Sequence, residues 1–430
     1  MKLTFENCLM LLPNRTVGFG DLETDGSVIS RITLRDPVDP GARSPRLILP
    51  GLVNCHGHTA MTLVRGLGGG LPLQRWLEEA IFPVEAKMTP ADVAAGTAWG
   101  VLEMLAGGTT AVADMYDFPA ACAEAFAAVG FKARVNRVGL SFVPGRLEDC
   151  IEFTRSFNRS PRRGSVLADI CVHSEYLTDE PFCRALAAAN NAGLKRPLHF
   201  HASETEKEHR ECIARHGKTP IAYLADTGLL DQGGYAAHCV WCTDDDFRIM
   251  AEKGVSLVHN PTSNMKLGSG FARIARAMEL GVNVALGTDG CASNDNLDMF
   301  EEMHLCSLVH KGLAKDPTVL SAWDVIEMAT KNGAKALGMD DTGEIAVGKK
   351  ADLCVVDLDR PHLTPCLDIP NLVVNSMHAS DVVETWVDGK RVYEKGRLGS
   401  LKSLETLRTL TSDRERLLSA VKRIGLENLT

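Results

Sequence analysis

The stretch NCHGHTAMTLVRG, Asn54–Gly66, directly follows the apolar run LILPGLV and contains two histidines separated by one glycine. An apolar run of this length is typical of a buried strand. Side chains alternate along a strand, so His56 and His58 would share one face while Cys55 and Gly57 share the other. Two imidazoles on one strand face suit a metal ion, but this pair alone does not distinguish a metal site from ordinary histidines beside a turn.

The same pattern repeats along the middle of the chain, where apolar runs end in polar residues and helix-like stretches follow. The eight runs are LVNCHGH (52–58), TTAVADMY (109–116), KARVNRVGL (132–140), ADICVHSEYL (168–177), RPLHFHASE (196–204), YAAHCVWC (235–242), VSLVHNPTSN (255–264) and NVALGTDG (283–290). Strands that alternate with helices imply a parallel sheet with right-handed crossovers. Eight such units predict an α/β fold, a closed (β/α)8 TIM-type barrel over residues 52–340.

An open, doubly wound sheet is the alternative to the barrel. Such a sheet needs a glycine-rich phosphate turn after its first strand. RGLGGGLP, residues 65–72, is glycine-rich but lacks the G-x-G-x-x-G spacing and a P-loop lysine. The barrel is therefore favoured. Within it, TPADVAAGTAWGVLEMLAGG predicts a helix with Thr89 as its N-cap and Gly107 as its stop.

The two ends of the chain differ from the middle. Residues 1–51 and 341–400 contain short strand-like pieces with turn signals, such as the hairpin pair Asp388-Gly389. We expect these two segments to meet in one small β-sandwich domain outside the barrel. The sequence SDRERLLSAVKRIG predicts an amphipathic helix in a C-terminal segment, residues 401–430.

Composition excludes several classes of protein. The chain has 430 residues and a formal net charge of −9, without a long Lys/Arg run, so a nucleic-acid partner is not expected. No window approaches the ~18 uncharged apolar residues of a membrane helix, and the apolar run Cys8–Leu12 is too short for a signal peptide. The 13 scattered cysteines then indicate reduced thiols in a cytoplasmic protein. A redox role for the single pair Cys239 and Cys242 is a weaker alternative.

Polar residues close most of the runs, at the strand ends where the active site of a TIM-type barrel lies. These residues are His56, His58, His173, His199, His201, Glu204, His238, His259, Asn260 and Asp289. Several imidazoles and a carboxylate on one barrel face would form a site for a divalent ion, with Zn²⁺ as the first expectation and Fe²⁺ or Mn²⁺ as competitors.

The expected ligands of one such ion are His56, His58, His201 and Asp289. His199 shares the inward parity of His201, and whether it is a ligand or a residue packed behind the ligands stays open. No lysine closes the fourth run, where a carbamylated lysine would suit a two-metal site, so one metal per chain is the simpler interpretation.

Glu204 and His238 remain as acid–base groups. A carboxylate beside a metal-bound water can pass a proton to a substrate nitrogen, and His238 can orient or deprotonate that water. Asp289 can assist in the same way while it binds the metal. Zinc lowers the pKa of bound water to about 7, so the expected chemistry is hydrolytic attack on an sp² carbon. The structural alternatives are a helix N-terminal carboxylate for Glu204 and a core histidine for His238.

The motifs PGLVNCHGHTAM, LHFHASET, AAHCVW, HNPTSNMKLGSG and LGTDGCASNDNLDM resemble the amidohydrolase superfamily, and within it the S-adenosylhomocysteine/5′-methylthioadenosine deaminase branch. GEIAVGKKADLCVVD, residues 343–357, resembles the segment where these enzymes return from the barrel to the small domain. The resemblance covers nearly the whole chain. It implies a homo-oligomeric, metal-dependent aminohydrolase in which Glu204 protonates the ring nitrogen and ammonia leaves.

The resemblance also implies a substrate and the residues that bind it. The substrate would be S-adenosylhomocysteine, 5′-methylthioadenosine or a related 5′-modified adenosine. Glu85 stands where the branch holds the ribose hydroxyls. Arg137, Arg146 and His173 stand where it holds the amino-acid carboxylate, and arginine forks suit that group.

Some positions depart from the branch. GLGGGLP lacks an expected acidic residue, Asp295 replaces an expected asparagine, and Arg273 replaces an expected proline. These departures fall in loops that we expect around the substrate, so they leave the identity of the nucleoside open. The alternatives are deamination of another heteroaromatic amine, such as a guanine-like base or an aminotriazine, a two-metal hydrolase of ring amides, and an inactive metal- or purine-binding relic.

Overall fold

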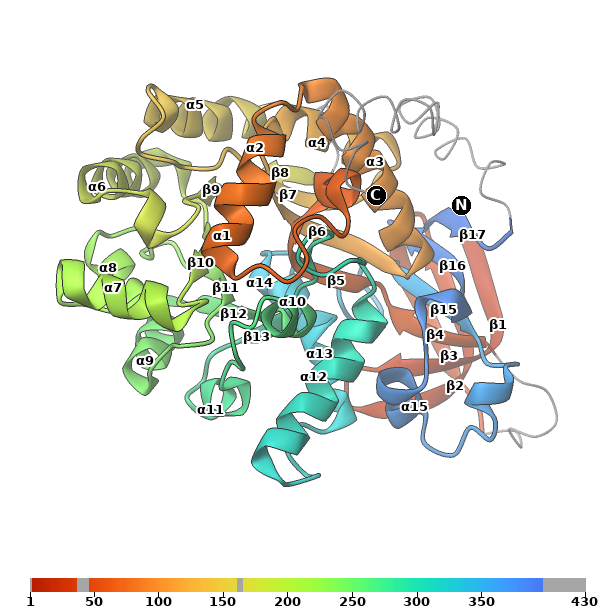
Figure 1. Cartoon of the computed structure of the whole chain (residues 1–430). Helices are drawn as coiled ribbons and strands as arrows, with labels where there is room; N and C mark the ends of the chain where they lie inside the picture. The colour runs from red at the N-terminus through yellow and green to blue at the C-terminus, as the bar shows by residue number, and fades with distance from the viewer. Residues whose placement is uncertain (1, 37–45, 161–164, 397–430) are drawn as a thin grey trace.

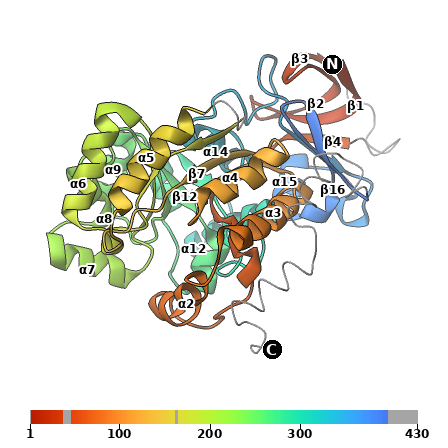
Figure 2. The same cartoon turned by 90° about the horizontal axis from the view of Figure 1, so that it is seen from above.

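The computed structural model describes residues 2–36, 46–160 and 165–396. It consists of a barrel of parallel strands with helices around it and a separate sheet beside the barrel (Figures 1 and 2). The amphipathic helix expected within residues 401–430 lies outside the described residues.

All eight predicted runs form parallel strands. They are β5 (Leu52–His58), β6 (Thr109–Met115), β7 (Lys132–Asn136), β8 (Val166–Ala168), β9 (Ile170–Cys171), β10 (Leu198–Ala202), β11 (Gly234–His238), β12 (Val255–His259), β13 (Val284–Leu286) and β14 (Asp289–Gly290). Nearly every residue in them is buried, as expected for strands covered on both faces.

The strands form two five-stranded sheets, ordered β13-β12-β11-β10-β9 and β14-β5-β6-β7-β8. At the start of the fourth run, β8, which extends two residues ahead of the run, belongs to one sheet and β9 to the other. The two strands of the eighth run, β14 and β13, are divided in the same way. The two sheets therefore meet at both of these runs. The carboxyl ends of the strands all point to the same side, which brings their polar residues together.

Helices follow the strands and cover the outside of the barrel (Figure 2). The longer ones are α3 (Pro90–Ala106), α4 (Pro119–Ala128), α5 (Arg146–Asn158), α6 (Glu180–Ala189), α7 (Glu206–His216), α9 (Asp244–Lys253) and α12 (Met299–Ala314). The shorter ones are α1 (Leu73–Arg75), α2 (Phe82–Glu85), α8 (Pro220–Asp226), α10 (Pro261–Lys266), α11 (Ile274–Glu279), α13 (Ala322–Met328), α14 (Lys331–Ala336) and α15 (Ile369–Asn375). The predicted helix α3 is confirmed with both ends: Thr89 and Asp92 form a capping box, and Gly107 is the C-cap. Among the described residues, no helix combines the length and the apolar character that crossing a membrane requires.

Both ends of the chain contribute to one continuous seven-stranded sheet. Its strands are β1 (Lys2–Leu12), β2 (Thr16–Asp25), β3 (Val28–Leu34), β4 (Arg46–Pro50), β15 (Leu353–Asp357), β16 (Val382–Val387) and β17 (Lys390–Glu394). The order is β17-β16-β15-β4-β1-β2-β3. The pairing of β4 with β15 joins the two ends, and the Asp388-Gly389 pair makes the turn between β16 and β17.

A buried ion pair joins the barrel to this sheet. Lys132 begins β7, and its ammonium group contacts the carboxylate of Asp352, which is completely buried, and Asp388 Oδ1 at 3.1 Å. Asp352 also accepts hydrogen bonds from Thr342 Oγ1 at 2.7 Å and the backbone N–H of Asp388 at 2.8 Å. Protein groups thus hold the carboxylate of Asp352, and Lys132 neutralises its charge.

Replacing Lys132 with methionine is expected to lower the free energy of unfolding by about 3–5 kcal/mol, because Asp352 would remain as an unpaired buried charge. Urea denaturation of the purified protein measures this loss. The matched control is Lys207→Met, since Lys207 lies on the surface 3.9 Å from Glu211. That change should cost less than about 1 kcal/mol. Equal losses for the two variants would contradict the role given to Lys132.

Candidate active site

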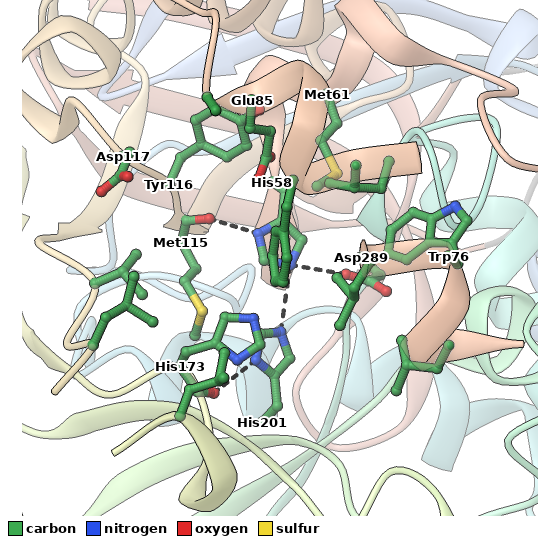
Figure 3. Close-up of a pocket in the computed structure, with 18 of the residues that line it drawn as sticks. His58, Met61, Trp76, Glu85, Met115, Tyr116, Asp117, His173, His201 and Asp289 are labelled. Carbon is green, nitrogen blue, oxygen red and sulfur yellow. Dashed lines mark hydrogen bonds and ion pairs between the residues drawn. The ribbon is translucent and has the colours of Figure 1, made fainter. Parts of the chain in front are cut away.

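The structure brings the four predicted metal ligands together at the carboxyl ends of three barrel strands. His56 and His58 end β5, His201 lies on β10 and Asp289 begins β14. Asp289 Oδ1 lies 3.1 Å from His58 Nε2 and 3.2 Å from His56 Nε2. His201 Nε2 lies 3.4 Å from His58 Nε2 (Figure 3). Four nitrogen and oxygen donors from distant parts of the sequence thus face one point.

Backbone carbonyls set the tautomers of two of these rings. His58 Nδ1 contacts the carbonyl oxygen of Met115, and His201 Nδ1 lies 2.8 Å from that of His173. A carbonyl only accepts, so each Nδ1 carries the proton and each Nε2 presents a lone pair toward the centre. His56 Nε2 is also buried there and lacks a hydrogen-bond partner among the described residues. A divalent cation fits this cluster of lone pairs around a carboxylate.

The second oxygen of Asp289 is already occupied. Asp289 Oδ2 accepts hydrogen bonds from Ser263 Oγ at 2.6 Å and Ser293 Oγ at 2.8 Å. These bonds hold the carboxylate so that Oδ1 faces the imidazoles. Asp289 has a positive φ of 62° and His238 one of 72°, a strained backbone conformation for residues other than glycine. Such strain is typical of functional sites, where the surrounding structure enforces it.

His238 and Glu204 lie next to the four predicted ligands. His238, Asp289, His56 and His201 also form a group whose donor atoms all lie within 4.8 Å of one another, so His238 competes with His58 for the place of a ligand. His238 Nδ1–H donates a hydrogen bond to Asn264 Oδ1 at 2.8 Å, which leaves the lone pair of Nε2 free. That Nε2 lies 3.8 Å from Glu204 Oε2.

Glu204 is buried at the carboxyl end of β10, just before α7. Its Oε1 accepts a hydrogen bond from Ser269 Oγ at 3.2 Å. Burial raises the pKa of Glu204, although His238 opposes the shift. A raised pKa shifts the carboxyl group toward its protonated form, which is the form that can donate a proton.

His199 lies behind His56, one of the four predicted ligands. Its Nε2 is 2.8 Å from His56 Nδ1, and its Nδ1 is 3.0 Å from Asn136 Nδ2. His199 is completely buried and is not among the residues that line the cavity described below. Among the predicted ligands, His199 forms its hydrogen bond with His56. His259, at the end of β12, pairs with His310 Nε2 at 3.0 Å and also lies outside the cavity wall.

A cavity of about 500 Å³ opens over this cluster. A volume of this size suits a small molecule. Its polar lining consists of His58, Glu85, Asp117, His173, His201, Glu204, His238 and Asp289. Its apolar and aromatic lining includes Trp76, Leu77, Ile81, Met88, Tyr116, Phe118, Val138, Leu140, Phe142, Tyr176 and Leu177. The cavity thus combines several ionisable groups with a lining that is mostly large apolar side chains.

Glu85 and His173 are in the cavity wall, as their expected roles require. Glu85 ends α2 beside Tyr116 (Figure 3). Burial raises the pKa of Glu85 to about 7, against the opposing effect of a hydrogen bond with Tyr116. His173 Nδ1 contacts Ser174 Oγ at 3.0 Å, and its ring centroid lies 4.6 Å from that of His201.

Arg137 and Arg146 are not among the cavity-lining residues. Both contact a carboxylate of the protein itself: Asp117 Oδ1 lies 3.2 Å from Arg137 Nη1 and 2.8 Å from Arg146 Nη1. Asp117 does line the cavity. Contact of the arginines with a substrate carboxylate stays a prediction. Asp117 itself is a residue that our sequence analysis missed, although it directly follows the second run, where the strand-end rule could have found it.

The positions that depart from the resembled branch do not line the cavity. Asp295 Oδ2 pairs with Lys266 Nζ at 2.6 Å. Arg273 pairs with Asp244 at 2.8 Å and donates to the carbonyl of Cys242 at 3.0 Å. All 13 cysteines are free thiols, and Cys239 and Cys242 are buried. Neither the departures nor these thiols contribute a side chain to the cavity wall.

Comparison with known proteins agrees with this geometry. A model of the amidohydrolase family matches residues 47–392. The 5-methylthioadenosine/S-adenosylhomocysteine deaminase of Acetivibrio thermocellus is 43% identical over 360 residues, 83% of each chain. The 5′-deoxyadenosine deaminase of Methanosarcina mazei is 42% identical over 382 residues, 87% of each chain. The crystal structure of an adenosine deaminase from Xanthomonas campestris with bound zinc is 31% identical, covers 97% of this chain and 98% of its own, and superposes with a TM-score of 0.87.

Proposed function

The chain belongs to the amidohydrolase family, and we propose that it hydrolytically deaminates the adenine ring of a 5′-modified adenosine. Water and the nucleoside would give the inosine analogue and ammonia. The class of substrate is that of the relatives: 5′-methylthioadenosine, S-adenosylhomocysteine and 5′-deoxyadenosine. The observation that supports the proposal most directly is the position of Glu204, in the wall of a nucleoside-sized cavity beside the imidazole and carboxylate cluster.

The family uses a divalent metal, and we propose one Zn²⁺ per chain. The residues that would hold it are His56, His58, His201 and Asp289. Three imidazole nitrogens and a carboxylate oxygen are a suitable donor set for zinc. When bound, the metal supplies Lewis-acid activation of a water molecule near neutral pH.

The remaining polar groups would then handle protons. Glu204, whose pKa is raised by burial, would donate in its protonated form to the ring nitrogen next to the amino-bearing carbon, which makes that carbon more electrophilic. His238 presents Nε2 to the same place, because Asn264 fixes its ring. It can accept the proton that the attacking water loses. The amine needs a proton to leave as ammonia, and His238, which holds the proton from the attacking water, can supply it. The proton of the added hydroxyl group can return to Glu204, 3.8 Å from His238, as the ring carbonyl forms.

Glu85 would bind the sugar. Its carboxyl group lies in the cavity wall, and the residue ends the short helix α2, which precedes α3. A carboxylate accepts hydrogen bonds from two neighbouring hydroxyl groups, which a ribose has and a free base lacks. This group therefore favours a nucleoside over a guanine-like base or an aminotriazine.

The proposal also includes a homo-oligomer located in the cytoplasm. The free thiols agree with a reducing compartment. Light scattering of the purified protein tests the assembly.

Ammonia release by the purified, zinc-loaded protein tests the reaction. We expect turnover of 5′-methylthioadenosine and 5′-deoxyadenosine, with formation of the matching inosine analogue, and no turnover of guanine or an aminotriazine. Turnover of free bases alone would contradict the sugar-binding role proposed for Glu85. No ammonia from any adenosine, with one metal bound per chain, would refute the proposed activity.

A further inference from the structure

Asp117 is a charged residue in the cavity wall to which the proposed reaction assigns no role. It follows β6 directly and precedes α4, so it stands at the carboxyl end of a barrel strand. Its side chain is 46% exposed. Figure 3 shows it on the same side of the cavity as Tyr116 and Met115, away from Trp76. A ligand that fills this side of the cavity meets the Asp117 carboxylate.

Two arginines stand behind Asp117. Arg146 begins α5, has a side chain only 7% exposed, and also donates to the carbonyl oxygen of Val138 at 3.1 Å. Arg137 has a second carboxylate partner, Asp149 Oδ2 at 3.4 Å. Both guanidinium groups share Asp117 Oδ1. Their charges are therefore compensated by carboxylates of the chain itself, and neither side chain belongs to the cavity wall.

This arrangement opposes a negatively charged substituent on the ligand. A substrate carboxylate would approach the Asp117 carboxylate first, and like charges at short range repel. To reach the arginines, it would have to displace Asp117 from two charge-assisted contacts. The neighbouring lining residues Val138, Leu140 and Phe142 are apolar and suit a methyl or methylthio group.

We propose that Asp117 is a specificity-determining residue that closes the arginine pair to substrate carboxylates. The enzyme then prefers adenosines whose 5′ substituent has no carboxylate, such as 5′-methylthioadenosine and 5′-deoxyadenosine, over S-adenosylhomocysteine. This inference rests on the proposed function and selects among the substrates that the relatives share.

The test compares kcat/KM for S-adenosylhomocysteine with that for 5′-methylthioadenosine. We expect the zinc-loaded wild-type protein to favour 5′-methylthioadenosine by about tenfold or more, the effect of one unpaired or repelled charge. Asp117→Asn keeps the shape but removes the charge, and it should raise the ratio in favour of S-adenosylhomocysteine by about tenfold. The matched control is Asp149→Asn, which removes a carboxylate from Arg137 outside the cavity wall. It should change the ratio by less than about threefold.

A second measurement needs no variant. The wild-type protein is given 5′-(3-aminopropylthio)adenosine, which is S-adenosylhomocysteine without its carboxylate. This compound should have a kcat/KM at least about tenfold above that of S-adenosylhomocysteine. A wild-type preference for S-adenosylhomocysteine that Asp117→Asn abolishes would overturn the inference, because Asp117 would then bind the amino group of the substrate. Equal rates for all three nucleosides would overturn it too, and both results would leave the deaminase activity standing. Only a lack of ammonia release from every adenosine tested would count against the proposed function.

Discussion

Replacing Glu204 with glutamine is expected to lower kcat for 5′-methylthioadenosine by about 10²–10⁴-fold. Glutamine has nearly the same shape and can keep the contact with Ser269 Oγ, but it has no acidic proton to give to the ring nitrogen. The loss should therefore appear in kcat, with a smaller change in KM. Steady-state ammonia release measures both constants.

Two further measurements separate this effect from damage to the site. Metal content should stay at the wild-type level in Glu204→Gln, since Glu204 is not an expected ligand. The matched control is Glu211→Gln on α7, the helix that follows Glu204, where Glu211 is half exposed and pairs with Arg215 on the surface. It should keep kcat within about twofold, as a surface charge far from the cavity has little effect on the chemistry. A kcat above one tenth of the wild-type value in Glu204→Gln would exclude Glu204 as the general acid.

The sequence was sufficient to predict the barrel strands because their signal is local. Each run is apolar over its own length and ends in polar residues, and every one of the eight forms parallel strands in the structure. The division of the fourth and eighth runs between two sheets was not predictable. It depends on which neighbour each short strand pairs with: β8 pairs with β7 and β9 with β10, while β13 pairs with β12 and β14 with β5. These pairings follow from the arrangement of the whole barrel and not from either segment alone.

For the candidate site as well, the sequence revealed local features but not tertiary contacts. Strand ends identified the cluster around Asp289, because parallel strands bring their carboxyl ends to one side. The partners of the arginines could not be found in this way. Arg137 and Asp117 are separated by 20 positions, and Arg146 and Asp117 by 29, so only the folded chain shows that both arginines share one carboxylate. The family resemblance indicated cationic side chains near a substrate, while the structure shows that Asp117, which contacts both arginines, lines the cavity and that the arginines do not.

His58→Ala and His238→Ala are expected to have different effects, which decides between two ligand sets. His58 Nε2 faces Asp289 Oδ1 at 3.1 Å, and its Nδ1 proton is held by the carbonyl of Met115. We therefore expect His58→Ala to lower zinc affinity by more than about 100-fold. Loss of a residue that only hydrogen-bonds to a metal ligand already lowers affinity by about 10–100-fold. Activity should fall below detection at the metal concentrations that saturate the wild-type protein.

His238→Ala should instead retain zinc and lose kcat by about 10²–10⁴-fold, as expected for a group that only moves a proton. Its ring is fixed by Asn264 with Nε2 toward Glu204, a position suited to the proton and not required for the metal. Competition with a chromogenic chelator measures affinity, and elemental analysis measures stoichiometry. If His238→Ala loses the metal while His58→Ala retains it, the ligands are His56, His201, His238 and Asp289. The proton that water loses would then have to pass to another group. Asp289 is the candidate, because its carboxylate lies beside the imidazoles of His56 and His58.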